Sequence, residues 1–371
     1  MSRAVRPKQS AYMEWAKTQS HARFNLATSG MISVPPTEFP ARVEEIEITA
    51  PGAYGYEPLQ QRLASHAGVS AESIVAAAGT SMANHLAMAA VLNPGDEILI
   101  EHPTYGLLTD LADYLGARIK RFERRPESNF AVDPAEVATK LTPQTRLIVL
   151  TNLHNPSGAL LPPDTLRAVA EVARDAGSRI LVDEVYLEML WDSSNLSAFR
   201  LGQEVASSSE NPFIITNSLT KAYGLSGLRC GWVIASPELA RRMWRLNDLF
   251  GVNAAHPAER LSVVAFDQLE QFRARARTLL AANRPLLDAF LDSRRELDCF
   301  RPPGGTVVFP RLLDGDAEIF VKRLREKYET SVVPGGFFEM PQHFRIGIGG
   351  ETTEVRAGLE RLGAALDDFG R

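Results

Sequence analysis

Short, continuously apolar runs alternate along this chain with longer segments whose apolar residues recur every three or four positions. Apolar runs of about four to eight residues are typical of strands buried on both faces of a sheet, and the longer spacing is typical of helices packed against it. Because the two patterns alternate, they predict an α/β fold, with a mostly parallel sheet covered by helices. Strands are expected at 73–78, 97–101, 146–151, 179–183, 213–217 and 230–235.

The segment after the strand at 146–151 shows the helical pattern most clearly. Its apolar residues recur at helical spacing from Leu166 to Ala173. Asp164 can cap the start of this helix, and Gly177 can end it, because glycine readily adopts the conformation that follows a helix. Together with the next strand, this segment is expected to form a βαβ unit.

The pattern changes beyond residue 261. A long, charged, amphipathic stretch at 268–295 is expected to be a helix that bridges two parts of the molecule. This region is expected to form a smaller α+β domain. Its other expected elements are a turn at 302–305, a strand at 306–309, a helix at 317–328 and a last helix from residue 354.

Composition is that of a globular protein. The chain has 371 residues, of which 45% are hydrophobic, enough for one large and one smaller domain. Its net charge of -5 leaves no electrostatic footprint for nucleic acid or an anionic membrane. The basic residues at 120–125 and 241–245 are expected to be solvated, the first group in a loop and the second on the outer face of a helix.

The cellular compartment is suggested by the cysteines. Cys230 and Cys299 are far apart, provide no disulfide framework and suit the reducing cytosol. The first fifteen residues carry scattered charges without the apolar centre of a signal peptide, and no apolar run approaches the length of a membrane span. We therefore expect a soluble cytoplasmic protein.

The stretch from Asn217 to Trp232 carries the most informative candidate chemistry. Lys221 follows an apolar strand and the hydroxyl residues Ser218 and Thr220, and it stands eight positions before Arg229. Hydroxyl groups and a guanidinium can together hold a phosphate dianion, and an amine beside it can form an imine with an aldehyde. Pyridoxal phosphate carries both groups and would explain the whole stretch. Taken alone, a lysine is more often a solvated surface charge.

Polar residues at other strand ends can serve the same cofactor, because ligands of α/β sheets bind at the carboxyl ends of strands. Thr80 and Ser81 lie between a strand and a helix, where backbone N–H groups can take phosphate oxygens; the alternative is a plain turn. Asp183 ends a buried strand, where a protonated pyridine nitrogen would suit it, unless it caps the next turn. Tyr186 can point the same way or merely pack.

Two further residues are candidates for binding a substrate. Asn155 begins the sequence Asn-Pro-Ser-Gly, which alone usually marks a turn. Arg345 lies in a strand-like run, and its planar guanidinium could hold a substrate carboxylate through two hydrogen bonds. The alternative for Arg345 is an ordinary salt bridge on an edge strand.

Together these motifs resemble those of the class I/II pyridoxal-phosphate aminotransferases, the aspartate aminotransferase-like enzymes of fold type I. They occur in the family's order from about Ala53 to Gly349. The most specific is Ser-Leu-Thr-Lys followed by Gly-Leu-Arg-Cys-Gly-Trp; Val-Asp-Glu-Val-Tyr and Asn-Pro-Ser-Gly support it, and Gly-Thr-Ser and Phe-Arg-Ile-Gly are weaker. The resemblance implies a large cofactor-binding domain at 46–280 and a small domain formed by 1–45 and 281–371.

The resemblance also implies how each residue meets the cofactor ring. Lys221 would bind the cofactor as an imine and then move a proton between the substrate Cα and the cofactor. Asp183 would pair with the ring nitrogen, and Tyr186 and Asn155 would hydrogen-bond the ring's phenolic oxygen. Tyr105 would stack on the ring face.

The remaining implied roles concern the phosphate and the substrate. Ser218, Arg229 and the amides of Thr80 and Ser81 would bind the phosphate group. Arg345 would bind the substrate α-carboxylate, with Asn155 and the backbone of Gly30 nearby.

Two positions depart from the family pattern. Met82 stands where the family often has an acid or an amide. The tyrosine that reaches the phosphate of the partner subunit has no clean counterpart, and Tyr54 is the nearest candidate. Because family members form the active site at a dimer interface, a homodimer is expected.

The activity expected from the resemblance is reversible transfer of an amino group from an L-amino acid to a 2-oxo acid. The same scaffold also hosts lyases, decarboxylases and cyclases, so the fold does not choose among them. A non-catalytic binding module is disfavoured by the lysine and by the lack of a DNA-binding segment before the domain. A dehydrogenase is disfavoured because Gly-x-Gly-x-x-Gly does not occur. No metal site is expected.

The sequence says less about the substrate. Tyr12, Trp15 and Tyr105 weakly favour an aromatic or bulky side chain on the amino acid. No second arginine can be placed opposite Arg345, so a dicarboxylate preference is neither supported nor excluded.

Overall fold

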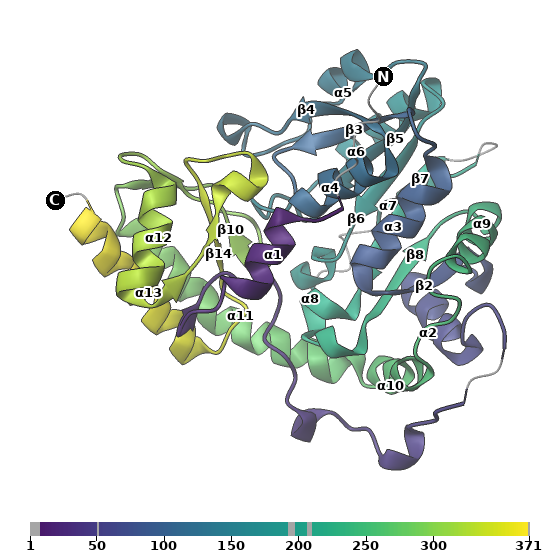
Figure 1. The fold of residues 1–371 in the computed structure, drawn as a ribbon, viewed down its shortest axis with the longest axis horizontal. Coiled ribbons are helices and arrows are strands. Elements are labelled where there is room, and N and C mark those ends of the chain that lie inside the picture. Colours follow the sequence, from purple (N-terminus) through teal and green to yellow (C-terminus); the bar gives the residue numbers. More distant parts are fainter. Residues whose placement is uncertain (1–7, 50–51, 192–196, 206–209, 370–371) are drawn as a thin grey trace.

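The computed structural model describes residues 8–49, 52–191, 197–205 and 210–369. At its centre lies a seven-stranded sheet with the strand order β2-β8-β7-β6-β5-β3-β4 (Figure 1). β8 runs antiparallel to its neighbours β2 and β7, and all other neighbouring strands run parallel. The strands are β2 (Ile74–Ala78), β3 (Glu97–His102), β4 (Arg118–Glu123), β5 (Thr145–Thr151), β6 (Arg179–Asp183), β7 (Phe213–Ser218) and β8 (Cys230–Ile234).

The predicted strands agree with this sheet, but one strand was not predicted. The six strands expected from the apolar runs are all present, with ends that differ by at most one residue. The solvated loop predicted at 120–125 is wrong, because most of this segment lies in β4. β4 comes last in the strand order, beside β3, and is an edge strand of the described sheet, where charged side chains are common because one edge faces solvent.

Alternate residues of the strands bury the two faces of the sheet. Leu147 and Val149 of β5 belong to a core shared with α3, α4 and α9, whereas Ile148 and Leu150 belong to the core of the opposite layer. The sheet is therefore covered on both faces, as the α/β prediction requires. The first layer is α3 (Gly79–Val91), α4 (Gly106–Leu115) and α9 (Pro237–Asn247); the second includes α2 (Glu57–Ala67), α5 (Pro134–Lys140), α6 (Pro163–Asp175), α7 (Ala198–Val205) and α10 (His256–Asp267).

The start of α6 differs from the prediction. Its N-cap position is Pro162, so the prediction that Asp164 caps this helix is wrong. Pro163 occupies the first helical position, where its fixed φ favours a helix start and its missing N–H needs no cap. The Asp164 carboxylate instead accepts a hydrogen bond from Arg167 at 2.8 Å. Gly177 follows the helix end with φ 67°, as predicted.

Short strands and helices of the C-terminal region lie beside the large sheet (Figure 1). β14 (Phe344–Gly347) is the middle strand of a three-stranded antiparallel sheet with β10 (Val307–Val308) and β13 (Val333–Pro334). The helix predicted at 268–295 is α11 (Leu269–Asp292), which contacts elements of both regions. The other elements are β9 (Leu297–Asp298), β11 (Arg311–Leu312), β12 (Thr330–Ser331), α12 (Ala317–Tyr328) and α13 (Thr352–Phe369).

The N-terminal segment joins this C-terminal region. β1 (Phe24–Asn25) pairs in parallel with β12, and α1 (Ala11–Thr18) lies between the two regions in Figure 1. The domain division at 46–280 stays a prediction. No helix in the described parts of the chain is long and apolar enough to cross a membrane. Short 3₁₀ helices lie at Pro36–Glu38, Val43–Glu45, Ala71–Ser73, Pro126–Ser128, Leu187–Leu190, Ser226–Leu228 and Gly335–Phe338.

Candidate active site

A cavity of about 310 Å³ opens at the carboxyl ends of β5, β6 and β7. These ends contribute Thr151, Asp183 and Ser218 to its wall. The structure thus brings together residues from distant parts of the sequence at the place where parallel sheets bind ligands. All nine residues predicted to bind the cofactor line this cavity: Thr80, Ser81, Tyr105, Asn155, Asp183, Tyr186, Ser218, Lys221 and Arg229.

Lys221 reaches this cavity from α8 (Leu219–Tyr223), which begins directly after β7. Its Nζ donates a hydrogen bond to Ser29 Oγ at 3.0 Å. Burial in the cavity lowers the pKa of Lys221; Tyr12 opposes this shift and Arg345 adds to it. Lys221 is therefore not a solvated surface charge, and its ammonium group loses a proton more readily than that of an exposed lysine.

Asp183 is held by a buried chain of hydrogen bonds. Asn84 Nδ2 donates to its Oδ2 at 2.9 Å, and the Val185 N–H donates to its Oδ1 at 3.2 Å. Thr216 Oγ1 donates to Asn84 Oδ1 at 2.6 Å, which fixes which end of the Asn84 amide faces Asp183. Burial raises the pKa of Asp183 to about 6, although the Asn84 and Val185 hydrogen bonds oppose the shift. Asn84 was not predicted; its position one helical turn after Thr80 was the available signal.

The wall at the start of α3 has the features of an anion site. Thr80 Oγ1 donates to Ser218 Oγ at 2.8 Å, and Arg229 Nη2 donates to the Ala78 carbonyl at 3.0 Å. Gly79 has φ 77°, and a Cβ at this position would stand 2.2 Å from Arg229 Nη2. Only glycine therefore allows the guanidinium to approach the N-terminus of this helix, where backbone N–H groups favour anions.

Aromatic residues form another part of the wall. The Tyr105 ring meets the Tyr12 ring edge to face, with centroids 5.3 Å apart and an interplanar angle of 89°. Tyr105 Oη donates to Met13 Sδ at 3.3 Å. Tyr186 is 4% exposed, and its burial raises the pKa of its hydroxyl. Tyr12 and Met13 come from α1, so the N-terminal segment contributes to the cavity.

Arg345 lies behind the wall, on the middle strand β14, and is 1% exposed. Its guanidinium donates to Asn155 Oδ1 at 2.7 Å, to Tyr12 Oη at 3.1 Å and to the Ala27 carbonyl at 3.1 Å. No carboxylate among the described residues forms an ion pair with it. The alternative of an edge-strand salt bridge is therefore wrong.

Gly30 lies directly against Lys221. A Cβ at residue 30 would stand 3.0 Å from Lys221 Cδ and 3.1 Å from its Cα. Ser29, which was not predicted, supplies the hydrogen-bond acceptor for Lys221. The predicted contact of the Gly30 backbone with a substrate stays a prediction.

The two departures from the family pattern lie elsewhere. Tyr54 is 56% exposed, and its hydroxyl donates to Asp248 at 3.0 Å. Met82 lines a separate small cavity beside Tyr56. The possibility that Tyr54 reaches a partner subunit stays a prediction.

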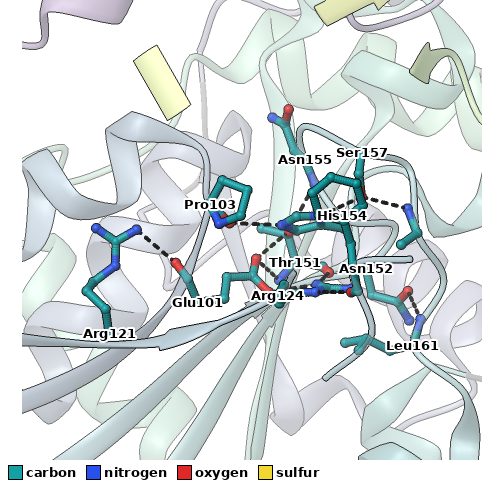
Figure 2. A network of polar contacts seen from close by, with 12 residues as sticks. Glu101, Pro103, Arg121, Arg124, Thr151, Asn152, His154, Asn155, Ser157 and Leu161 are labelled. Atoms are coloured by element: carbon teal, nitrogen blue, oxygen red, sulfur yellow. Dashed lines mark hydrogen bonds and ion pairs between the residues drawn. The ribbon is translucent and has the colours of Figure 1, made fainter. Parts of the chain in front are cut away.

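A buried polar network lies next to the cavity, between β3, β4 and the loop that carries Asn155 (Figure 2). Arg124 and Glu101 are both 0% exposed and form an ion pair, with Arg124 Nη1 2.8 Å from Glu101 Oε2. The prediction that Arg124 is solvated is therefore wrong. Glu101 Oε1 accepts from the N–H and the hydroxyl of Thr151, at 2.8 and 2.6 Å. Thr151 Oγ1 in turn accepts from the Asn155 N–H at 3.0 Å.

Known proteins are similar to this chain in sequence and in architecture. The family described as aminotransferase class I and II matches residues 49–362. Arginine–pyruvate transaminase from Pseudomonas aeruginosa is 31% identical over 318 residues, which cover 79% of this chain and 76% of that protein. Capreomycidine synthase from Streptomyces vinaceus is 29% identical over 295 residues, which cover 79% and 74%. A PLP-dependent aminotransferase from Streptococcus suis has the same fold, with a TM-score of 0.85 at 24% identity over 98% of this chain and 100% of that one.

The chain belongs to the class I and II aminotransferase family. It has the α/β architecture of fold type I, its cofactor is pyridoxal phosphate, and it is an aminotransferase, as the sequence motifs predicted.

Proposed function

We propose that this chain transfers the amino group of an L-amino acid with a bulky, uncharged side chain to a 2-oxo acid, with Lys221 as the catalytic residue. The observation that carries the proposal is the grouping of an amine, a carboxylate and a guanidinium around one cavity. Lys221 and Asp183 line the cavity, and Arg345 contacts its wall residues Tyr12 and Asn155.

The residues present fit pyridoxal phosphate. Thr220 Oγ1 is buried in the cavity wall with no hydrogen-bond partner in the described structure, and a phosphate oxygen would give it an acceptor. Asp183 has a raised pKa because its burial is only partly compensated, and a protonated pyridine nitrogen would provide the missing positive partner. The close approach of Arg229 to Gly79 leaves a cationic group at the N-terminus of α3.

Each of these groups would bind one part of the cofactor. Pyridoxal phosphate supplies an aldehyde that combines with amines and a ring that withdraws electrons from the substrate Cα. Asp183 would hold the ring nitrogen, and Tyr186 and Asn155 the phenolic oxygen. Tyr105 would cover the ring face. Ser218, Arg229 and the amides of Thr80 and Ser81 would hold the phosphate.

Lys221 is suited to carry a proton at its Nζ atom. The lowered pKa of this lysine favours the neutral amine, which can accept a proton from the substrate Cα and return it at another position. Ser29 Oγ, 3.0 Å from Nζ, can hold the amine close to this place. Gly30 leaves room for the lysine side chain, because a Cβ there would stand 3.0 Å from Lys221 Cδ.

Arg345 is suited to bind the substrate carboxylate. Three hydrogen bonds to Asn155, Tyr12 and Ala27 fix the plane of its guanidinium. Its Nε is buried and has no partner among the described residues, so one donor of the guanidinium is unsatisfied. Charge-assisted pairing of a guanidinium with a carboxylate is strong and directional, which would orient the substrate Cα.

The remaining wall favours an uncharged substrate side chain. Tyr12, Met13 and Trp15 of α1 line the cavity together with Tyr105. Apart from Asp183, Lys221 and Arg229, no described residue of this lining carries a charge. A charged side chain would lose its hydration here without gaining a counter-ion, whereas an aromatic or branched side chain would gain apolar contacts.

Cyclisation of an amino acid is a second candidate, favoured by the similarity to capreomycidine synthase. The two reactions differ in what happens to the cofactor when no 2-oxo acid is added. Transamination leaves the amino group on the cofactor, whereas cyclisation or elimination returns the cofactor unchanged.

The chain is also proposed to act as a cytoplasmic homodimer. Large apolar side chains are exposed at Val43 (80%) and Ile48 (86%), and at Leu249 (76%) and Val252 (60%). Glu47 of the 43–48 segment lies 3.3 Å from His256, the first residue of α10, which follows Leu249 and Val252 by a few positions. We propose these exposed side chains as the docking surface for a second copy. Cys230 and Cys299 are unpaired in the structure, which suits a reducing compartment.

The test is an absorbance titration of the purified holoenzyme with single amino acids in the absence of any 2-oxo acid. L-Phenylalanine and L-leucine are expected to convert the cofactor to its aminated form at lower concentration than L-aspartate or L-arginine. Trp15→Ala is expected to weaken the response to L-phenylalanine more than the response to L-alanine. A preference for arginine would contradict the proposed substrate class, and consumption of the donor with an unchanged cofactor would replace transamination by cyclisation or elimination.

A further inference from the structure

We propose that Glu101 and Arg124 are positioning residues of the active site, which act by fixing Asn155 through Thr151. The inference rests on the proposed function, because Asn155 matters here as a partner of Arg345 and of the cofactor ring. Neither Glu101 nor Arg124 lines the cavity, so neither is proposed to touch the substrate.

Stability alone does not account for this pair. Both side chains are 0% exposed, and removing two charges from water costs much of what their attraction returns. Apolar residues of similar size commonly stabilise a fold at least as well as a buried ion pair. What apolar residues cannot supply is a set of hydrogen-bond acceptors and donors in a fixed arrangement.

The hydrogen bonds of this network have a defined direction. An ionised carboxylate only accepts, so the Thr151 hydroxyl must donate to Glu101 Oε1, 2.6 Å away. The lone pairs of the same hydroxyl are then left for the Asn155 N–H at 3.0 Å. Asn155 Oδ1 accepts from Arg345 at 2.7 Å, so a continuous path runs from the buried pair to the arginine that would bind the substrate.

Arg124 contacts both Glu101 and Thr151 of this hydrogen-bond network. Its Nη1 donates to Glu101 and lies 3.3 Å from the Thr151 carbonyl, and its Nε donates to the Phe130 carbonyl at 2.7 Å. The charge of Arg124 favours the ionised form of Glu101, against the burial that raises the pKa of this carboxyl. Arg124 therefore helps to keep Glu101 a pure acceptor.

His154 ties the same loop to the segment before Tyr105 (Figure 2). Burial lowers the pKa of His154 well below its ordinary value, so the ring is neutral near pH 7. The Pro103 carbonyl can only accept, so His154 Nε2 donates to it at 2.9 Å, and Nδ1 accepts from the Ser157 hydroxyl at 2.6 Å. The network thus fixes the Asn155 loop relative to the backbone that leads to Tyr105.

The same strand provides a matched control. Glu97, at the other end of β3, is also a poorly exposed carboxylate that accepts from a β5 threonine, with Thr145 Oγ1 3.1 Å away. Glu97 lies at the end of the strand away from the cavity, which opens at the carboxyl ends of the strands. Glu97→Gln therefore disturbs a similar contact without disturbing Asn155.

The experiment compares Glu101→Gln, Arg124→Met, the double variant and Glu97→Gln as holoenzymes. Three quantities are measured: the unfolding temperature, the dissociation constant of 3-phenylpropionate (an unreactive carboxylate), and the pH at which the absorbance of the bound cofactor changes. Glutamine at 101 can turn its NH₂ group towards Thr151 and compete with the Asn155 N–H. Because Asn155 accepts from the guanidinium proposed to bind the carboxylate, the single variants are expected to bind 3-phenylpropionate at least tenfold more weakly and to shift the pH transition.

The double variant separates positioning from stability. It contains no unpaired buried charge, so its unfolding temperature is expected to recover towards that of the wild type, while the binding defect and the shifted pH transition remain. Glu97→Gln is expected to lower the unfolding temperature only. The proposal is overturned if Glu101→Gln matches the wild type in both the pH transition and the binding constant, or if the double variant regains both together with stability. If the wild type itself does not bind 3-phenylpropionate, the proposed substrate class fails, and the pH transition still tests the positioning role.

Discussion

Asn in place of Asp183 is expected to stabilise the cofactor-free protein while impairing the enzyme. The pKa of this buried carboxyl rises from 3.8 to about 6 in the folded state. The folded chain therefore binds this proton more tightly than the unfolded chain does. Ionisation of Asp183 therefore destabilises the fold, whereas ionisation of a salt-bridged aspartate stabilises it. The destabilisation is fully present above about pH 6 and disappears as the pH falls towards 3.8.

The size of the effect follows from the same shift. Charging Asp183 destabilises the fold by about 3 kcal/mol at pH 8 and by about 1.6 kcal/mol at pH 5. Asp183 accepts from Asn84 on one oxygen and from the Val185 N–H on the other, so an asparagine loses one of these bonds, which costs about 1 kcal/mol. Asn84 cannot turn to compensate, because Thr216 donates to its oxygen. Asp183→Asn is therefore expected to raise the free energy of unfolding of the cofactor-free protein by about 2 kcal/mol at pH 8.

The assay is urea unfolding of cofactor-free wild type and Asp183→Asn at pH 5 and pH 8. The free energy of unfolding of the variant is expected to exceed that of the wild type by about 1.4 kcal/mol more at pH 8 than at pH 5. This difference does not depend on the lost hydrogen bond, because that bond is absent at both pH values. The variant is also expected to bind pyridoxal phosphate more weakly, because a neutral amide does not stabilise a protonated ring nitrogen. A stability difference between variant and wild type that is equal at the two pH values, or larger at pH 5, would refute the reasoning about Asp183.

Further predictions concern the phosphate end, the carboxylate site and the proposed dimer. Gly79→Ala, whose Cβ would stand 2.2 Å from Arg229 Nη2, is expected to weaken cofactor binding at least tenfold, as measured by fluorescence titration. Arg345→Lys keeps the charge but loses the planar set of N–H donors that can pair with a carboxylate. Steady-state kinetics is therefore expected to show a KM for the amino donor raised at least tenfold and a smaller change in kcat. Ile48→Glu is expected to lower the molar mass found by light scattering to that of a single chain, while the control Ile319→Glu, at a residue 60% exposed in α12, leaves it unchanged.

The sequence predicted those parts of the site that depend on short, ordered motifs. Lys221 and Asp183 stand in segments whose strand–loop–helix pattern already places them at the carboxyl edge of a parallel sheet. Arg229 instead precedes β8 and reaches the same edge because β8 runs antiparallel to β7. Their meeting in one cavity follows from the sheet topology once the strands are correctly identified.

The parts that could not be predicted depend on contacts between distant segments. Arg124 belongs to a charged stretch that resembles a solvated loop, and only the pairing of β4 with β3 buries it beside Glu101. Asn84 is one of several polar residues in the first half of α3, and its role becomes visible only when Asp183 is placed next to it. Ser29 has no local pattern at all and is brought to Lys221 by the packing of the N-terminal segment. Asp164 has the residue type of a cap, but Pro163 beside it starts the helix without one.

The proposed role of Lys221 is tested most directly by trapping the cofactor with borohydride and locating it by peptide mass spectrometry. Reduction of the holoenzyme is expected to add one cofactor per chain, on the peptide that contains Lys221, and Lys221→Ala is expected to carry none. Recovery of the cofactor on another lysine, or failure to trap it in a wild-type protein that holds it, would contradict the account.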